Sequence, residues 1–231
     1  MSQDRRPISQ REHGWAKALT RALVQAGVTP NLISFSSIVF AAFGGLCFYA
    51  IGLAVSAGDR VLLCIGAALF CQLRLLANMM DGMVAVEGGK GGPDGPVWNE
   101  LPDRFADIFI LVGAGYGAAA LGVADASLGW AAAVAAVMTA YVREVARGAG
   151  APADFSGPMA KPHRMFVMTV AALLSATTPL WGAYPFSSEL PPRGAMETSQ
   201  ILHIALWIVL IGSIFVALNR TRRALAFLNK R

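Results

Sequence analysis

Four oxygen-bearing side chains stand at helical spacings near the middle of the sequence. Asn78 and Asp81 are three residues apart, and Asp103 and Asp107 are four apart. On helices, each pair lies on one face. Two such faces brought together form a cage of oxygen ligands, which Mg²⁺ and Mn²⁺ prefer over thiolate or imidazole. The sequence therefore predicts a divalent-metal site at these four residues.

Small side chains follow the first pair, and a cation precedes it. Gly82 and Ala85 continue the face of Asp81 with almost no side chain, which leaves room for a bulky ligand such as a diphosphate. Arg74 stands one turn before Asn78, inside an apolar run where an isolated charge is costly. Its guanidinium can reach the interface, contact a phosphate or pair with a site carboxylate. Of these three uses, pairing with a carboxylate is the prediction we favour.

The composition indicates a membrane protein. Of the 231 residues, 55% are hydrophobic and only 14% are charged, which is unlike a soluble domain. Several apolar runs approach the roughly 20 residues that a helix needs to cross hydrocarbon. The runs cover about 29–54, 61–80, 103–121, 127–141, 161–181 and 201–218. The predicted fold is therefore an all-α integral membrane protein with six transmembrane helices.

The chain divides into three parts around these spans. Residues 1–28 form an N-terminal segment in which Trp15 and Leu19 follow a helical spacing, with Lys17 and Arg21 elsewhere. This pattern predicts an amphipathic helix that lies in the membrane interface. Residues 29–220 form the six-helix domain, and residues 221–231 form a basic C-terminal tail.

The positive charges predict an orientation. All but three of the 19 Lys and Arg residues fall in the N-terminal segment, two connections and the tail; the exceptions are Arg60, Arg74 and Arg193. By the positive-inside rule, both termini and the carboxylates face the cytoplasm. The basic residues flank apolar spans and do not interleave with aromatic residues, so we expect anionic membrane lipids as partners and no nucleic acid.

Four cations on the same side complete a candidate site. Arg143 and Arg147 follow the fourth apolar run, and Lys161 and Arg164 open the fifth. Metal ions would neutralise a diphosphate, while these cations would hold a second anionic group. This division suits phosphoryl-type transfer, in which positioning and charge neutralisation supply most of the catalysis. Alternatively, the cations serve only as anchors at the membrane surface.

The central stretch resembles the signature of the CDP-alcohol phosphatidyltransferases, a family of integral membrane enzymes. That signature reads D-x-x-D-G-x-x-A-R, a spacer, and then G-x-x-x-D-x-x-x-D. Five pattern positions are matched, by Asp81, Gly82, Ala85, Asp103 and Asp107. Three positions differ, with Asn78 for the first Asp, Val86 for the Arg and Asn99 for the second Gly.

The resemblance implies a reaction and roles for the residues. The donor would be CDP-diacylglycerol, and CMP would leave as a small polyol hydroxyl attacks. Asp107 would accept the proton from that hydroxyl. Asp81 and Asp103 would hold two Mg²⁺ or Mn²⁺ ions, with Asn78 as a neutral ligand. The phrase Thr29-Pro30-Asn31 is similar to a helix start common in the family. It would place Asn31 near the CDP-lipid, together with Asp81, Gly82 and Ala85.

The acceptor site also resembles a known arrangement. Arg143-Glu144, Arg147 and Lys161 are similar to the R-E…R…G-K pattern of phosphatidylglycerophosphate synthases, although Ala160 replaces the Gly. This favours a phosphorylated polyol such as glycerol 3-phosphate, and inositol phosphate remains open. The family likeness also implies a homodimer, and we expect it in a bacterial inner membrane.

Two other functions compete with the transferase. A catalytically silent protein that binds CDP-lipid or scaffolds a partner would explain the departures at Asn78, Val86 and Asn99. Glu87 and Glu100 are nearby carboxylates that would restore the lost charge in an active enzyme. An ion or proton transporter would use the same carboxylates, but it would require them near mid-span.

Overall fold

The computed structural model describes residues 13–89, 92–122, 125–182 and 194–230, and all of its regular elements are helices. These residues form seven helices. They are α1 (Gly14–Gln25), α2 (Pro30–Ile51), α3 (Ala57–Glu87), α4 (Gly95–Ala120), α5 (Ser127–Gly148), α6 (Lys161–Trp181) and α7 (Ala195–Leu228). Five of them, namely α2, α3, α5, α6 and α7, are long and apolar enough to cross a membrane. The protein is thus an all-α, multi-pass membrane protein.

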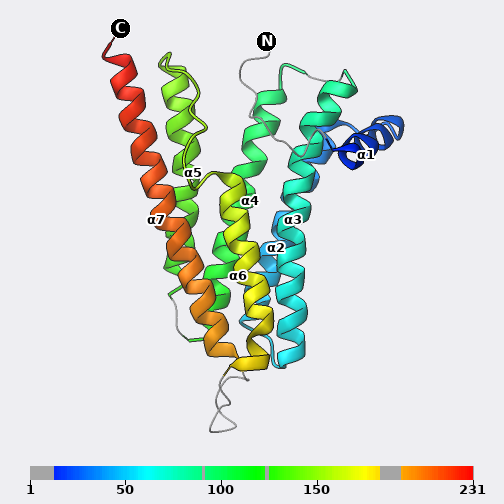
Figure 1. Ribbon diagram of the computed structural model, residues 1–231, viewed down its shortest axis with the longest axis vertical. Coiled ribbons are helices and arrows are strands. Elements are labelled where there is room, and N and C mark those ends of the chain that lie inside the picture. The colour runs from blue at the N-terminus through cyan, green and yellow to red at the C-terminus, as the bar shows by residue number, and fades with distance from the viewer. Residues whose placement is uncertain (1–12, 90–91, 123–124, 183–193, 231) are drawn as a thin grey trace.

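Helix α4 covers the third of the six predicted spans but is not among those five. It carries Asp103, Arg104 and Asp107. The helix packs against α2, α5 and α7 in the middle of the bundle (Figure 1). A central helix is shielded from lipid by its neighbours, so it can carry charges that face other helices. Six spans therefore remain a prediction, with α4 as the sixth.

The helix ends follow local signals only in part. Thr29 caps α2, because its Oγ1 accepts a hydrogen bond from the N–H of Leu32 at 3.3 Å, and Pro30 occupies the first turn. The third predicted span, 103–121, begins too late. Helix α4 begins at Gly95, about two turns earlier, and Pro102 lies inside it.

Helix α1 lies beside one end of α3 and across the direction of the other helices (Figure 1). Its buried residues, Ala16 and Thr20, face α3. The Thr20 hydroxyl lies 3.9 Å from the sulfur of Met80 and 3.8 Å from that of Met83. Residues 10–12 of the predicted amphipathic helix lie outside the described part of the chain.

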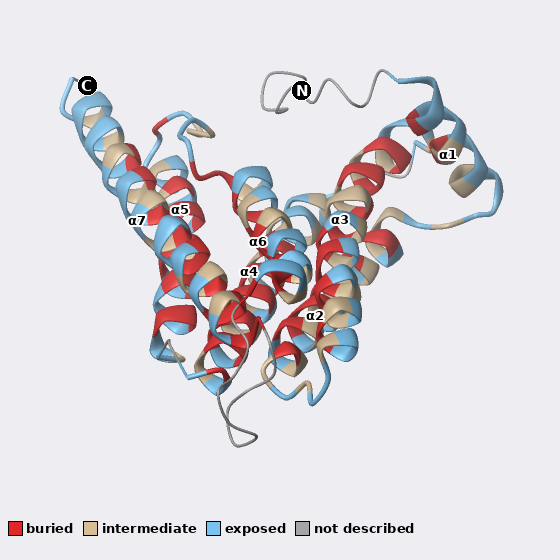
Figure 2. Ribbon diagram, turned by 60° about the horizontal axis from the view of Figure 1, so that its bottom comes forward, coloured by how far each residue is buried: buried red, intermediate tan, exposed pale blue. Residues whose placement is uncertain are grey.

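Burial separates the inner faces of the helices from the outer ones (Figure 2). The buried side chains are mostly small, with many Ala and Gly, whereas large apolar side chains such as Leu46, Leu62 and Ile211 are exposed. Small residues between helices and large apolar residues outside are typical of a bundle that packs in lipid. The exposed apolar surface is therefore the lipid-facing surface.

Glycines allow α2 and α4 to approach closely. A Cβ on Gly113 would collide with the backbone carbonyl of Gly45, and a Cβ on Gly117 would collide with that of Phe48. On the other side of α4, Gly115 meets the Cα of Gly129 on α5, which a Cβ would approach to 2.7 Å. These contacts fix the rotation of α4 and hence the direction of its carboxylates.

We expect Gly113→Ala to destabilise the protein by about 1–3 kcal/mol, because the added methyl pushes α4 away from the α2 backbone. The thermal transition in detergent should fall accordingly. Gly95→Ala is the matched control, since it makes the same change at the first residue of α4, where a Cβ meets nothing within 4 Å. Equal transition temperatures for the two variants would contradict the role of this contact.

Candidate active site

Residues from three helices meet around the carboxylate of Asp103. On α3, Asn78 donates an Nδ2–H to Asp103 Oδ1 at 3.1 Å. On α6, the ammonium group of Lys161 donates to both Asp103 Oδ2 and Asn78 Oδ1. Arg74, also on α3, donates from Nη2 to Asp103 Oδ1 at 3.1 Å. We call Arg74, Asn78, Asp103 and Lys161 the Asp103 cluster.

The prediction that Arg74 pairs with a site carboxylate is confirmed. Its side chain is fully buried, and Asp103 is its ion-pair partner. Among the described residues, its Nε and Nη1 atoms have no hydrogen-bond partner. A buried guanidinium with one carboxylate for its charge is held in place chiefly by that ion pair.

A second ion pair lies one turn further along the same helices. Arg164 follows Lys161 by one turn on α6, and Asp107 follows Asp103 by one turn on α4. Arg164 donates from Nη2 to Asp107 Oδ2 at 2.6 Å and from Nε to Oδ1 at 3.3 Å. Its Nη1 donates to the carbonyl of Met159 at 2.8 Å. Both side chains are almost wholly buried.

Asp81 is bound by neutral groups only. The hydroxyl of Ser34, on α2, donates to its Oδ2 at 2.8 Å, and the N–H of Gly82 donates to its Oδ1 at 2.5 Å. Among the described residues, no Lys or Arg is in ion-pair contact with Asp81, unlike Asp103 and Asp107. Ser34 was not predicted as a site residue, although it follows Asn31 by one turn.

Arg143, on α5, forms an ion pair with Glu100 of α4. Its Nη2 donates to Glu100 Oε2, and its Nε donates to Glu144 Oε1 at 2.8 Å. The guanidinium also lies 4.8 Å from the centroid of the Phe155 ring, in cation–π geometry. Glu100, which we considered as a substitute for a lost metal ligand, is thus a partner of Arg143 and Arg104.

The other predicted binding residues lie further out. Arg147 is half-exposed and 3.8 Å from Glu144. Asn31 is on the first turn of α2, where its Nδ2 donates to Asp94 Oδ2 at 3.0 Å. Gly82 and Ala85 are partly exposed on the turns that follow Asp81. Glu87 is exposed at the end of α3.

Arg220 holds the connection between α5 and α6, a role that the sequence did not reveal. It lies on α7, and its Nη1 donates to the carbonyl of Thr139 at 2.7 Å. Its Nε and Nη2 donate to the carbonyl of Ser156 at 3.2 and 3.1 Å. The residues expected as a basic tail continue α7 as far as Leu228. Little in the sequence indicated this role, because other basic residues follow Arg220 closely.

A surface ion pair adds to this connection. Arg223 donates to Asp154 at 2.7 Å, and Ser156 donates to Asp154 from both its N–H and its hydroxyl. Partial burial alone would raise the pKa of Asp154, but the Ser156 hydrogen bonds and the Arg223 charge together hold this pKa below its ordinary value.

The carboxylates of Asp81, Asp103 and Asp107 differ in how well their surroundings suit a bound divalent cation. Among the described residues, no three His, Cys, Asp or Glu side chains are grouped so as to hold a metal ion. The oxygens of Asp103 and Asp107 already face Lys and Arg nitrogens. The carboxylate of Asp81 forms no ion pair among the described residues, although the charge of Lys161 still acts on it. Mg²⁺ is often bound by one or two carboxylates together with substrate phosphates. Asp81 is therefore the residue that fits a metal ion.

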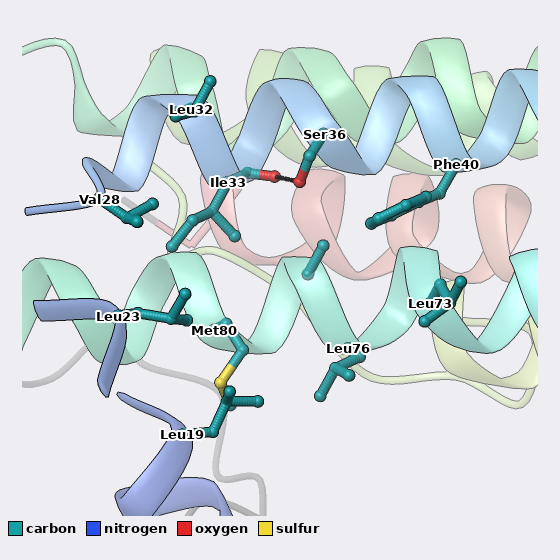
Figure 3. Close-up of a pocket in the computed structure, with 11 residues that line it drawn as sticks. Leu19, Leu23, Val28, Leu32, Ile33, Ser36, Phe40, Leu73, Leu76 and Met80 are labelled. Carbon is teal, nitrogen blue, oxygen red and sulfur yellow. Dashed lines mark hydrogen bonds between the residues drawn. The ribbon is translucent and has the colours of Figure 1, made fainter. Parts of the chain in front are cut away.

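An apolar pocket of about 320 Å³ lies next to Asp81, between α1, α2 and α3. Figure 3 shows Ile33 on α2 pointing toward α3, and Met80 on α3 pointing toward Leu19 of α1. Ile33 and Met80 are the chain neighbours of Ser34 and Asp81. The pocket thus lies beside the turn of α3 that carries Asp81.

Known proteins resemble the chain over most of its length. No family model matches the chain. The chain is 26% identical over 208 residues to a phosphatidylinositol phosphate synthase from Mycolicibacterium smegmatis, covering 89% of this chain and 81% of that protein. It is 25% identical over 208 residues to a protein of the same name from Mycobacteroides abscessus, covering 87% of this chain and 80% of that protein.

Solved structures share the fold. The phosphatidylinositol phosphate synthase of Mycobacterium tuberculosis in complex with manganese and citrate has a TM-score of 0.67 at 19% identity, covering 90% of this chain and 87% of that chain. The same enzyme with CDP-DAG bound has a TM-score of 0.66 at 20% identity, covering 90% and 92%. The likeness in sequence to the two synthases, and in fold to the solved structures, thus runs over about nine-tenths of the chain.

Proposed function

We propose that the chain transfers a phosphatidyl group from CDP-diacylglycerol to a hydroxyl of an inositol phosphate and releases CMP. One observation carries the proposal: three carboxylates and two cations of α6, the buried Arg164 and the partly buried Lys161, gather at one end of the bundle, beside an apolar pocket. Such a site can neutralise a diphosphate and an acceptor phosphate while the pocket holds a lipid chain. Charge neutralisation and positioning are the main demands of phosphoryl-type transfer.

The acceptor differs from the one that the sequence pattern first suggested. Glycerol 3-phosphate was favoured by the spacing of Arg143, Arg147 and Lys161. The relatives are named for phosphatidylinositol phosphate, which is the product when a phosphatidyl group is attached to an inositol phosphate. Lys161, Arg164 and Arg143 are cations suited to the acceptor's phosphate. Arg147 is more exposed and contributes less to this proposal.

The reaction balances with residues of this chain. The acceptor oxygen attacks the phosphorus on the lipid side of the diphosphate, and the bond from that phosphorus to the CMP oxygen breaks. The proton of the acceptor hydroxyl passes to Asp107. Arg164 now occupies both oxygens of Asp107, and an acceptor phosphate would compete for this guanidinium. Substrate binding would thereby free the carboxylate to act as the base.

A divalent ion, Mg²⁺ or Mn²⁺, would supply charge neutralisation for the diphosphate when bound. Asp81 is the ligand that the geometry favours, and Asn78, Asp103 and Asp107 stay predictions. Asn31, Gly82 and Ala85 would line the CDP part of the donor. One acyl chain would lie in the apolar pocket of Figure 3.

The position of the site supports a transferase over a transporter. Asp81 lies near the end of α3, Asp103 lies near the start of α4, and Lys161 is the first residue of α6. Charges at one end of a bundle suit chemistry at a membrane surface, whereas a transport site lies near the middle. The cytoplasmic orientation, the bacterial inner membrane and the homodimer remain predictions.

The test is CMP release by the purified protein in lipid nanodiscs with CDP-diacylglycerol and Mn²⁺. We expect inositol phosphate to support release at least about tenfold faster than inositol or serine, because an ion-paired phosphate contributes about 1.5–3 kcal/mol. Release should stop when the metal is removed with EDTA. Faster release with glycerol 3-phosphate would refute the proposed acceptor. Absence of release with every acceptor would favour a silent protein that binds CDP-lipid.

A further inference from the structure

Asp103 faces more positive charge than one carboxylate can neutralise. Lys161 and Arg74 both form ion pairs with it, whereas Arg104, whose Nη2 lies 3.9 Å from its Oδ2, is paired more closely with Glu100 at 3.0 Å. The Asp103 side chain is nearly buried, so water screens these charges weakly. A divalent cation that approached Asp103 would therefore meet net positive charge.

Asn78 is matched to this arrangement by its amide. It donates from Nδ2 to Asp103 and accepts at Oδ1 from Lys161. An Asp at position 78 could not donate to Asp103, and its charge would repel the Asp103 carboxylate when the two were this close. The Asn at position 78, where the family pattern has Asp, therefore suits the contact of Lys161 with both Asn78 and Asp103. The ammonium group bridges two oxygen ligands from α3 and α4, as a bound cation would.

We propose that Lys161 takes the place of one metal ion, so that this chain binds a single divalent cation, at Asp81. The inference rests on the proposed function for the presence of any metal ion. The family resemblance implies two ions, whereas this inference gives one. Asn78 and Asp103 then bind Lys161 and no metal ion. The carboxylate of Asp81 is available to bind the remaining ion, because its hydrogen-bond partners are the neutral Ser34 hydroxyl and Gly82 N–H.

The test counts bound Mn²⁺ and does not depend on turnover. The purified protein in nanodiscs that contain CDP-diacylglycerol, whose diphosphate supplies further oxygen ligands, is titrated with Mn²⁺ without any acceptor. Free Mn²⁺ is followed by its EPR signal, and empty nanodiscs with the same CDP-diacylglycerol provide the blank. We expect one bound ion per chain. The double variant Asn78→Asp/Lys161→Met removes the ammonium group and adds a carboxylate, so it should bind two. Lys161→Arg keeps the positive charge and should still bind one, whereas Asp81→Asn should bind none.

Two ions on the unaltered protein, or one on the double variant, would overturn the inference. Retained binding in Asp81→Asn would overturn the assignment of the remaining ion. A thermal transition measured on each sample shows that the variant is folded before its ions are counted. The ion count and CMP release can fail separately. One bound ion without CMP release refutes the proposed function alone, and CMP release with two bound ions refutes this inference alone.

Discussion

Asp81→Asn is expected to lower CMP release by about 10³-fold, an effect on the order of that seen when a preorganised charge-stabilising group is removed. Asp81 is the carboxylate of the three that forms no ion pair with a described Lys or Arg, so its oxygens are available for a metal ion. Asn has the same shape and can still accept the hydrogen bond from Ser34. The variant should therefore fold, and α3 should pack against α2 as in the unaltered protein. The measurement is the rate of CMP release at saturating Mn²⁺ and inositol phosphate.

Ser34→Ala separates the charge of Asp81 from its placement. This change removes the 2.8 Å hydrogen bond to Asp81 but leaves the carboxylate charged. Loss of a group that orients a metal ligand typically costs about 10–100-fold. We expect release to fall within that range and to recover partly as Mn²⁺ is raised. An Asp81→Asn variant that kept more than a tenth of the original rate would contradict the role given to this carboxylate.

Arg164→Met is expected to destabilise the protein by about 3–5 kcal/mol, because it leaves a buried carboxylate without a partner. Arg164 is 2% exposed, and Asp107 is fully buried. Met retains much of the volume and so limits the effect to the lost charge. The thermal transition in nanodiscs should fall sharply, and CMP release should be lost even below that temperature, because the acceptor phosphate loses a cation.

The double variant Asp107→Leu/Arg164→Met provides the control for folding. Replacing both partners by apolar side chains removes the unpaired charge, and such replacements are often neutral for stability. We expect the thermal transition to return close to its original value, while CMP release stays absent because the proposed base is gone. A transition as low as that of the single variant would show that the ion pair is not what limits stability. Retained CMP release in the double variant would refute Asp107 as the base.

Much of the fold follows from the sequence. The apolar runs placed α2, α5 and α6 close to their observed starts, and Thr29 and Pro30 correctly marked the start of α2. The predicted bounds of α3, 61–80, and of α7, 201–218, were less accurate. Helix α3 begins at Ala57 and continues to Glu87, and α7 continues to Leu228. An apolar run ends where side chains meet a polar environment, but the backbone hydrogen bonds of a helix can continue beyond that point.

The sequence by itself identified most residues of the candidate site, although it did not identify Ser34. The spacings of Asn78 with Asp81 and of Asp103 with Asp107 put each pair on one helix face, and Lys161 and Arg164 followed at one-turn spacing at the start of a span. Local periodicity is sufficient for that, because it depends only on the geometry of a single helix.

Only the tertiary structure decided which cation faces which carboxylate. Arg164 and Asp107 are 57 residues apart, and the local sequence around each does not indicate that the two side chains form an ion pair. The pairing depends on how α4 is rotated against α2, which the contact of Gly113 with Gly45 fixes. With α4 in that rotation, Lys161 reaches both Asn78 and Asp103, while Asp81 is left with the Ser34 hydroxyl. Side-chain charges act over a few ångströms, so packing between helices decides what each carboxylate can bind.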